Sequence, residues 1–495
     1  MYQSEYVIAY DQGTSGLKAA LITLDGALIA CATEAYPLYR PAPGYAEQDP
    51  DDYWDAVCRT TVAVMKKAQA NPANARGIVF CAIWKSLIPV DRDIRPLRRS
   101  LIWLDSRAVD EADEINRRIG EERYVPADYW PKLLWFYKHE RHIYDACYKI
   151  IGVNTYLGWK ATGELVTNIS DSFIFAHSAA QQAVYDHALE GTGISKEKFV
   201  PWVESSSSIG KLHDRAAVEM GLVPGIPVFA GSGDIQAIAI GAGSGAPGKI
   251  HAYFGSSGWV GMLQEYGKPT PRISPLNQQY NVDAIGGIKA SLSLNWAIDQ
   301  FYHDEKEKLQ DGIFTFLEEE LKQIPAGSDG LLVVPSLFGG TTAQTRNERA
   351  SFVRVSDKHT RAHLVHGVME GVCMLIRSFN QERFAQQAKL GAYTIRAVGG
   401  GACNDRWMQI LANVLNVPVE IPYHCRHVGT IGSAYHALIG LGLYDNYEQA
   451  AKCIRIEKTF YPQKDAVEIY EAAFAEFEAL RKALYPIYNH GIRRE

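Results

Sequence analysis

The chain has 495 residues, of which 47% are hydrophobic and 21% are charged, and its formal net charge is −6. Two large domains, or three, are expected because one hydrophobic core rarely serves a chain of this length. The mildly acidic balance, without a run rich in Lys or Arg, argues against nucleic acid and anionic membranes as partners. The 8 cysteines are scattered without a C-x-x-C pair. With no apolar leader and no stretch long enough to span a bilayer, this pattern predicts a cytoplasmic protein.

The first third of the chain predicts strands, then a helix, then another strand. Short β-branched and aromatic runs around a strong Asp-Gly turn indicate a β-meander. An Asp-Pro pair then provides an N-cap and a first helical residue, and the apolar residues behind it recur at helical spacing. This order of elements is typical of an α/β fold. The expected elements are strands at 6–11, 17–22 and 28–30, the turn Asp25-Gly26, a helix that follows Asp49-Pro50, and a buried strand at 77–83.

Two segments that lie half the chain apart share one pattern. An apolar strand over residues 6–11 runs into Gly13-Thr14-Ser15-Gly16, and one over 249–254 runs into Gly255-Ser256-Ser257-Gly258. Turns built from glycine and small hydroxyl residues let backbone N–H groups converge on an anion. Two such turns predict two halves that together hold a polyphosphate. The alternative is a pair of ordinary hairpin turns.

A glycine-rich stretch at 241–248 lies just before the second of these strands, and its composition suits a hinge. We therefore expect a first domain over residues 1–245 and a second over 246–495. Apolar residues at helical spacing predict a last helix over 465–485, which ends before Pro486 and caps the second domain.

One strand-to-helix turn carries an acidic residue. The strand at 226–230 ends in Gly231-Ser232-Gly233-Asp234, and a helix is expected over 235–240. Asp234 therefore lies at a helix N-terminus on the rim of a sheet, where ligands collect in α/β folds. It is either an N-cap or a base that accepts the proton of a substrate hydroxyl in phosphoryl transfer. Asp11, at the end of the first strand, is either an Asx-turn residue or a carboxylate beside hydrated Mg²⁺.

A further turn is built from glycines. The strand at 394–398 leads into Gly399-Gly400-Gly401-Ala402-Cys403-Asn404, and a helix is expected over 407–415. Three consecutive glycines let a flat ligand lie against bare backbone. This turn lacks the G-x-G-x-x-G spacing of a dinucleotide-binding turn, and the sequence contains no Walker phosphate loop.

Seven stretches, in this order, resemble the FGGY family of carbohydrate kinases, within the actin-like ATPase superfamily. They are spread over essentially residues 6–440. The resemblance implies an α/β fold of two actin-like (RNase H-like) domains, with nucleotide and sugar in the cleft between them. The stretches are Asp11–Ser15, Trp103–Arg107, Gly233–Ala237, Phe254–Gly258, Pro335–Gly340, His363–Gly371 and Gly399–Asn404.

The resemblance also implies the residues of the site. The nucleotide would be ATP, Mg²⁺ would lie near Asp11 and be held through water, and Asp234 would be the base for the sugar hydroxyl. Either tryptophan of the expected sugar site could instead be a core residue. The residues expected to bind ATP are Gly13, Thr14, Ser15, Ser256, Ser257, Gly400, Gly401, Ala402 and Asn404. Those expected to contact the sugar are Lys85, Trp103, Asp105, Asp234, Gln236 and Trp259.

The strand that touches the sugar departs from the family pattern. Xylulokinase-like members carry Met-His-Gly or a close variant there, and the matching positions here are Trp84-Lys85-Ser86. Lys85 is either a solvated residue at a strand end or a donor to a carboxylate or hydroxyl of the substrate. A carboxylate partner would admit sugar acids such as gluconate. The segment Ser351–Val355 and the residue before Lys132 also differ from the family, which leaves the sugar open.

The expected function is transfer of the γ-phosphoryl group of ATP to a small open-chain sugar, with D-xylulose or a similar ketopentose first. A sugar acid (gluconate) or a polyol is the alternative acceptor. A different class is an actin-like ATPase without sugar transfer. Asp234, the two tryptophans and the lack of a peptide-binding or filament-like appendage argue against it. A catalytically dead sugar sensor is opposed by the presence of both Asp11 and Asp234. The oligomeric state, a homodimer included, stays open.

Overall fold

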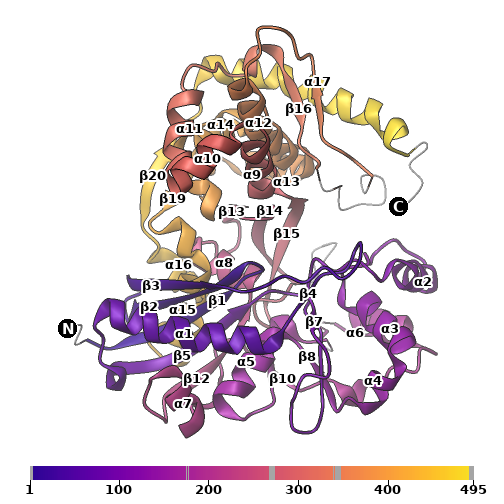
Figure 1. Cartoon of the computed structure of the whole chain (residues 1–495), viewed down its shortest axis with the longest axis vertical. Coiled ribbons are helices and arrows are strands. Elements are labelled where there is room, and N and C mark those ends of the chain that lie inside the picture. The colour runs from indigo at the N-terminus through magenta and orange to yellow at the C-terminus, as the bar shows by residue number, and fades with distance from the viewer. Residues whose placement is uncertain are drawn as a thin grey trace. The chain divides into compact units, whose positions relative to one another are not determined.

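The computed structural model describes residues 4–173, 175–176, 178–266, 274–337, 339 and 347–489. Phe338 and Gly340 of the family-like stretch Pro335–Gly340 lie outside the described residues. The chain is mixed α/β and packs as two compact units (Figure 1). The first unit comprises Met1–Gly241, Leu263–Asp283 and His427–Cys453, and the second comprises Ala242–Met262, Ala284–Arg426 and Ile454–Glu495. Two segments from the second half of the sequence thus pack with the first half, and the domain boundary at residue 245 stays a prediction.

Six strands form the sheet of the first unit: β1 (Tyr6–Gln12), β2 (Gly16–Thr23), β3 (Leu28–Ala35), β5 (Ala75–Ala82), β11 (Ser208–Lys211) and β12 (Pro227–Gly233). Their order is β11-β12-β5-β1-β2-β3. β1, β2 and β3 form the predicted antiparallel meander, whereas β1, β5 and β12 are parallel. Every residue of β1 except Asp11 is buried, as expected of a central strand that is covered on both faces.

The helices of the first unit are α1 (Pro50–Ala68), α2 (Val109–Ile119), α3 (Tyr129–His139), α4 (Arg141–Ala146), α5 (Val153–Thr162), α6 (Ala179–Leu189), α7 (Asp214–Met220), α8 (Asp234–Gly241), α15 (Val428–Gly440) and α16 (Tyr447–Lys452). The predicted start of α1 is confirmed, because Asp49 caps it by accepting the N–H of Asp51. α1 packs on β2 and β3, and α5 packs on β5 and β12 (Figure 1). α15 packs on α8 and on β1, β5 and β12, so a late segment of the chain covers this sheet.

Short strands of the first unit pair two by two, as β4 with β7, β6 with β8, and β9 with β10. They are β4 (Glu47–Gln48), β6 (Ile88–Val90), β7 (Ser100–Leu101), β8 (Lys149–Ile151), β9 (Thr167–Asn168) and β10 (Trp202–Val203).

Six strands form the second sheet: β13 (Ile250–Phe254), β14 (Gly258–Glu265), β15 (Tyr280–Ile288), β18 (Ile395–Val398), β19 (Val419–Pro422) and β20 (Ile456–Phe460). Their order is β15-β14-β13-β18-β19-β20. β13 pairs antiparallel with β14 and parallel with β18, just as β1 pairs with β2 and β5. The two segments with the shared sequence pattern therefore hold equivalent places, and each shared turn is the hairpin that ends its central strand.

The second unit also contains the small ladder of β16 (Leu332–Val334) with β17 (Ser351–Val353). Its helices are α9 (Ala290–Phe301), α10 (His303–Leu309), α11 (Ile313–Leu321), α12 (Arg361–Phe379), α13 (Gln381–Leu390), α14 (Asp405–Leu415) and α17 (Lys464–Asn489).

The prediction that the last helix ends before Pro486 is wrong, because α17 continues to Asn489 with Pro486 inside it. A proline this close to a helix end removes little more than one backbone hydrogen bond. Tertiary contacts hold the last turn. The hydroxyls of Tyr488 and Ser351 are hydrogen-bonded at 2.7 Å, and Asn347 donates to the Asn489 side chain at 2.9 Å.

Each unit encloses its own hydrophobic core. In the first unit, Tyr6 and Tyr10 of β1 and Tyr53 of α1 are fully buried in one cluster. In the second unit, Trp407 of α14 packs edge to face against Phe254 of β13, with ring centroids 5.1 Å apart. Among the described helices, none has the length and the apolar run that crossing a bilayer requires.

Candidate active site

Asp234 lies at the junction of β12 and α8, as the sequence predicts. Its Oδ1 accepts the N–H of Ile235 at 3.0 Å. Burial and then the negative charge of Asp11 raise the pKa of Asp234 to about 7, although the backbone N–H groups of Ile235 and Trp84 oppose the shift. A carboxylate with a pKa near neutrality suits a general base that acts on a hydroxyl.

Asp11, at the end of β1, is a second carboxylate in this part of the first unit. Its Oδ2 lies 3.2 Å from Lys18 Nζ, and 13% of its side chain is exposed. Gly429, at the start of α15, fits closely against it, since a Cβ there would lie 2.5 Å from the same oxygen. In the described part of the chain, no three His, Cys, Asp or Glu side chains are grouped to hold a metal. A single, partly exposed carboxylate still fits Mg²⁺, which keeps water and phosphate oxygens as its other ligands.

The turn at Gly13-Thr14-Ser15 is held from inside the first unit by four side chains. Gln12 and Tyr36 donate to the Gly13 carbonyl, and Gln48 donates to the Thr14 carbonyl at 2.7 Å. The indole N–H of Trp103 donates to the Thr14 hydroxyl at 2.8 Å. Trp103 therefore lies beside the predicted phosphate turn. The carbonyl oxygens of Gly13 and Thr14, which would repel an anion, thus accept hydrogen bonds from side chains of the first unit. This arrangement favours binding of an anion on the opposite side of the turn.

Each residue of Trp84-Lys85-Ser86 is anchored to a different element. The Trp84 indole N–H donates to the Ser170 carbonyl at 3.0 Å, and the Ser86 hydroxyl accepts the first N–H of α5 at 2.9 Å. The Lys85 ammonium pairs with Asp128, and 12% of each side chain is exposed. The positive charge of Lys85 is thus matched by a carboxylate within the protein.

Sequence reasoning missed Ser170 and Asp171, which lie close to Asp234. Asp171 is buried, its Oδ1 accepts the hydroxyl of Tyr129, and its Oδ2 has no hydrogen-bond partner among the described residues. Burial, together with the charge of Asp234, raises the pKa of Asp171 to about 7. The preceding Ser170 accepts the N–H of Gly233 at 2.8 Å, which fixes this turn to the strand of Asp234. Its Asn-Ile-Ser-Asp pattern, typical of a capped turn, was the available signal.

Two other predicted acceptor residues of the first unit are engaged inside the protein. Asp105 is fully buried, and its carboxylate is held by the Arg107 guanidinium and by the Ala46 N–H at 2.7 Å. Gln236 is also fully buried, and its amide donates to the Ser274 hydroxyl at 2.7 Å. These contacts give both residues a structural role, and their contact with an acceptor stays a prediction.

The second unit carries the other predicted turns. Ser256 is exposed and Ser257 is partly exposed on the hairpin between β13 and β14. After β18, Gly400–Cys403 form a short 3₁₀ turn, and the Asn404 side chain caps α14 at 2.8 Å. A Cβ built on Gly400 would meet open space, so this turn offers bare backbone to a flat ligand.

Trp259, the predicted acceptor wall of the second unit, is a packed residue of β14. It is 8% exposed, and its ring centroid lies 5.3 Å from that of Tyr253 and 5.0 Å from that of His251. These contacts favour a core residue, and a role of Trp259 at the acceptor stays a prediction.

Cys403 in the glycine turn lies beside a second thiol, with 3.4 Å between its Sγ and that of Cys425. All eight cysteines are free, and Cys403 is exposed whereas Cys425 is buried. The Gly399 N–H donates to the Cys425 carbonyl at 2.8 Å, which ties the pair to the turn. The hydrogen bond from Cys425, with help from Arg426, holds the pKa of Cys403 below its ordinary value.

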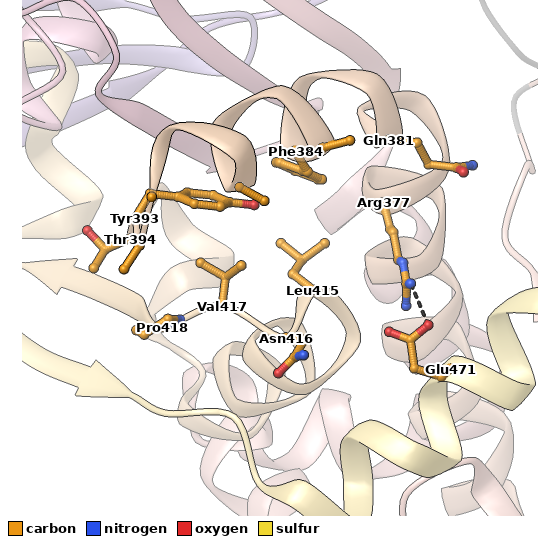
Figure 2. Close-up of a pocket in the computed structure, with 14 residues that line it drawn as sticks. Arg377, Gln381, Phe384, Tyr393, Thr394, Leu415, Asn416, Val417, Pro418 and Glu471 are labelled. Carbon is orange, nitrogen blue, oxygen red and sulfur yellow. Dashed lines mark hydrogen bonds and ion pairs between the residues drawn. The ribbon is translucent and has the colours of Figure 1, made fainter.

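A cavity of about 880 Å³ lies elsewhere in the second unit (Figure 2). Tyr393 and Thr394, just before β18, and Val417, just before β19, line it. The glycine turn follows the other end of β18, so the cavity and the turn lie at opposite ends of these strands. Arg377 in the cavity wall is paired with Glu471 at 2.7 Å (Figure 2). The cavity is therefore separate from the predicted nucleotide turn.

Comparison with known proteins places this arrangement in a family. The chain matches the FGGY family of carbohydrate kinases, with its N-terminal domain over residues 6–241 and its C-terminal domain over 266–441. A xylulose kinase of Bacillus subtilis (strain 168) is 27% identical over 483 residues, which cover 95% of each chain. An autoinducer-2 kinase of Photorhabdus laumondii is 25% identical over 524 residues, which cover 99% of this chain and 96% of that protein.

A solved structure of gluconate kinase from Lactobacillus acidophilus superposes with a TM-score of 0.81 at 23% identity, over 98% of this chain and 99% of that one. The likeness confirms the predicted α/β fold of two actin-like domains. The three relatives are named for three different acceptors, so the resemblance leaves the acceptor of this chain unassigned. The chain belongs to the FGGY family of carbohydrate kinases and is a sugar kinase, for which ATP is the phosphoryl donor.

Proposed function

We propose that the acceptor is a small neutral sugar, with D-xylulose or a similar ketopentose first. The observation that carries this proposal is the ion pair of Lys85 with Asp128. An ammonium that is already matched by a carboxylate gives a sugar acid little net attraction. The negative charge of Asp11 raises the pKa of Asp234, and that of Asp234 raises the pKa of Asp171, so these carboxyls concentrate negative charge in one region. A neutral acceptor meets no such repulsion and can donate its hydroxyls to carboxylate oxygens.

In the proposed reaction, Asp234 accepts the proton of the acceptor hydroxyl as that oxygen forms a bond to the γ-phosphorus of ATP and ADP leaves. Little bond to the attacking oxygen forms early in a loose transition state, so the proton moves late. A pKa of about 7 leaves a substantial fraction of Asp234 ionised at neutral pH. The hydrogen bond from the Ile235 N–H helps to fix the orientation of the carboxylate.

We assign the nucleotide to the turns of the two units. Gly13–Ser15 and Ser256–Ser257 would contact the phosphates, and Gly400–Asn404 would contact the adenosine. The carbonyls of the first turn, which accept hydrogen bonds from side chains of the first unit, and the open backbone at Gly400 support this assignment. Asp11 would hold Mg²⁺ through water, and the ion would neutralise charge on the phosphates.

The alternatives remain a sugar acid or polyol as acceptor and, as a different class, an ATPase without sugar transfer. The gluconate kinase relative keeps the sugar acid among the acceptors to be tested. We also propose a cytoplasmic location, because all eight thiols are free.

ADP release from ATP–Mg²⁺ tests these proposals against D-xylulose, D-ribulose, L-ribulose, glycerol, erythritol, gluconate and a well without acceptor. Stimulation by a ketopentose is the expected result. Stimulation by gluconate alone would contradict the neutral acceptor and assign Lys85 to the substrate carboxylate. Equal turnover in every well would move the protein to the ATPase class.

A further inference from the structure

Lys85 has a strained backbone conformation beside the proposed base. Its φ of +64° lies in the left-handed region, where a residue with a Cβ is disfavoured. Such a conformation persists only where the surrounding structure holds it. Lys85 directly follows Trp84, whose indole N–H donates to the Ser170 carbonyl, and the Ser170 hydroxyl accepts the N–H of Gly233, the residue before Asp234. The conformation of this turn therefore affects the position of the strand end that carries Asp234.

Three residues at the start of α3 hold all three polar groups of Lys85. The Tyr129 hydroxyl accepts the Lys85 N–H at 2.9 Å, and Asp128 pairs with its ammonium. The ammonium of Lys132 donates to the Lys85 carbonyl. Because residues four apart lie on one face of a helix, a single turn of α3 reaches the backbone donor, the backbone acceptor and the side-chain charge.

Lys132 is the member of this group that connects two parts of the site. It is fully buried, and its ammonium also donates to the Ile102 carbonyl at 3.0 Å. Ile102 directly precedes Trp103, whose indole N–H bonds Thr14 in the predicted phosphate turn. Lys132 thus binds the backbone beside the proposed base and the backbone beside the phosphate turn at the same time.

A buried ammonium is costly, and packing alone does not account for it. Burial lowers the pKa of Lys132 to about 7, which measures how strongly the site disfavours the charge. A methionine would fill a similar volume without that cost. Asp105 and Asp128 favour the charged form, whereas Lys85 and Arg107 oppose it. These opposing charges offset one another. What Lys132 adds over a methionine is therefore the pair of hydrogen bonds that it donates to the carbonyls of Lys85 and Ile102.

We propose that Lys132 is a positioning residue for phosphoryl transfer, which fixes the carbonyls of Lys85 and Ile102 and thereby places the backbone beside Asp234 and the Trp103 indole. This inference rests on the proposed role of Asp234 as the base. Lys132 acts through the two backbone segments and is not itself a catalytic group.

Steady-state kinetics of Lys132→Met and Lys132→Gln test the proposal in the full chain, with ATP and the best acceptor varied in turn. We expect Lys132→Met to lower kcat/KM for the acceptor roughly 100-fold, the typical cost of a misplacement of about 1 Å. Lys132→Gln should recover part of the loss, because its amide donates hydrogen bonds without a charge. It also serves as the test variant if Lys132→Met does not fold.

Leu134→Ala is the matched control, since Leu134 is a buried core residue on the same helix. It should lower the melting temperature and leave the kinetics for the acceptor unchanged at a temperature where the protein is folded. A Lys132→Met variant that behaves like Leu134→Ala would show that Lys132 only stabilises the fold and would overturn the proposal.

A double-mutant cycle with Lys85→Gly identifies the route of the effect. Glycine adopts a positive φ without strain, so the turn depends less on Lys132 for its conformation. In the Lys85→Gly background, Lys132→Met should cost about ten-fold less in kcat/KM than in the wild-type background. An equal loss in both backgrounds would contradict the proposal. Retained activity in Asp234→Asn would instead contradict the base assignment, whatever these ratios are.

Discussion

Ser232 and His436, which lie 204 residues apart in the sequence, are hydrogen-bonded at 2.8 Å beside the strand end that carries Asp234. Ser232 donates its own proton to the Gly233 carbonyl at 3.0 Å, so it accepts the Nε2–H of His436. The Nδ1 of His436 then accepts the Tyr447 hydroxyl at 2.8 Å. His436 is thus a neutral imidazole with both nitrogens engaged, and it joins α15 to the catalytic strand.

This neutral histidine predicts a loss of stability in mild acid. Burial lowers the pKa of His436 to about 3, below its ordinary 6.5. The stability that it contributes is therefore present above pH 6.5 and is lost as the pH falls towards 3, by about 2 kcal/mol at pH 5. Melting temperatures measured between pH 8 and pH 4 should fall less steeply in His436→Gln than in the wild type. Parallel curves would contradict the prediction.

The base assignment predicts both a variant and a pH profile. Asp234→Asn should lower kcat by roughly 10² to 10⁴, the usual contribution of a general base, with nucleotide binding retained. Because the pKa of Asp234 is raised to about 7, kcat/KM for the acceptor in the wild type should rise as the pH increases through 7. Initial rates between pH 5 and 9 measure this limb. An unchanged rate in Asp234→Asn would sink the assignment.

Asp171 predicts a stability gain from a conservative substitution. Its pKa of about 7 in the folded chain lies above the unfolded value of 3.8, so its contribution is present below pH 3.8 and is lost as the pH rises through 7. Asp171→Asn should therefore be more stable than the wild type at pH 8, by up to about 4 kcal/mol, and similar to it near pH 4. Denaturant unfolding at both pH values checks this, and destabilisation at both would contradict it.

The charge argument for the acceptor predicts a change in specificity. Asp128→Asn removes the carboxylate that pairs with Lys85 and so weakens the neutralisation of the ammonium. The ratio of kcat/KM for gluconate to that for the best ketopentose should then rise about ten-fold, which corresponds to 1.4 kcal/mol. Glu5→Gln, which removes a carboxylate that pairs with Arg76, is the control for loss of an ion pair elsewhere in the same unit. A ratio that does not move would argue against Lys85 as a determinant.

Cys403 provides a test of the nucleotide turn. It is exposed and its pKa is lowered by the hydrogen bond from Cys425, so it should react with iodoacetamide at pH 7 faster than the exposed Cys453. A non-hydrolysable ATP analogue should protect Cys403 and leave Cys453 unaffected. Peptide mass spectrometry after timed alkylation measures both rates. Alkylation of Cys403 that the analogue does not slow would count against adenosine at this turn.

The local elements could be predicted from the sequence because their signals are local. A few neighbouring residues determine each of three features: the cap at Asp49-Pro50, the hairpin at Asp25-Gly26, and the position of Asp234 at a strand-to-helix junction. The two repeats of one strand-and-turn pattern likewise indicated two related sheets. Pro486 was misjudged because distant contacts of Tyr488 hold a turn that its local sequence would end.

The buried residues that support the candidate site could not be predicted in this way. Lys132 and Asp171 are recognisable only through partners that are tens of residues away, such as the Lys85 carbonyl and the Tyr129 hydroxyl. Asp105 looks like a free acid in the sequence, and only the fold reveals that Arg107 and a backbone N–H occupy its carboxylate. Burial and pairing across elements, which periodicity does not encode, decide these roles.

The position of α15 sets the timing with which the first unit can mature during synthesis. Its sheet is complete in sequence by Gly241, but α15, which packs on β1, β5 and β12, ends only at Gly440. At roughly 5–20 residues per second, a ribosome needs about 10 to 40 s to make the intervening 200 or so residues. Throughout that interval the nascent sheet lacks the helix that covers it in the folded chain, so we expect its folding to be completed only after α15 has been synthesised.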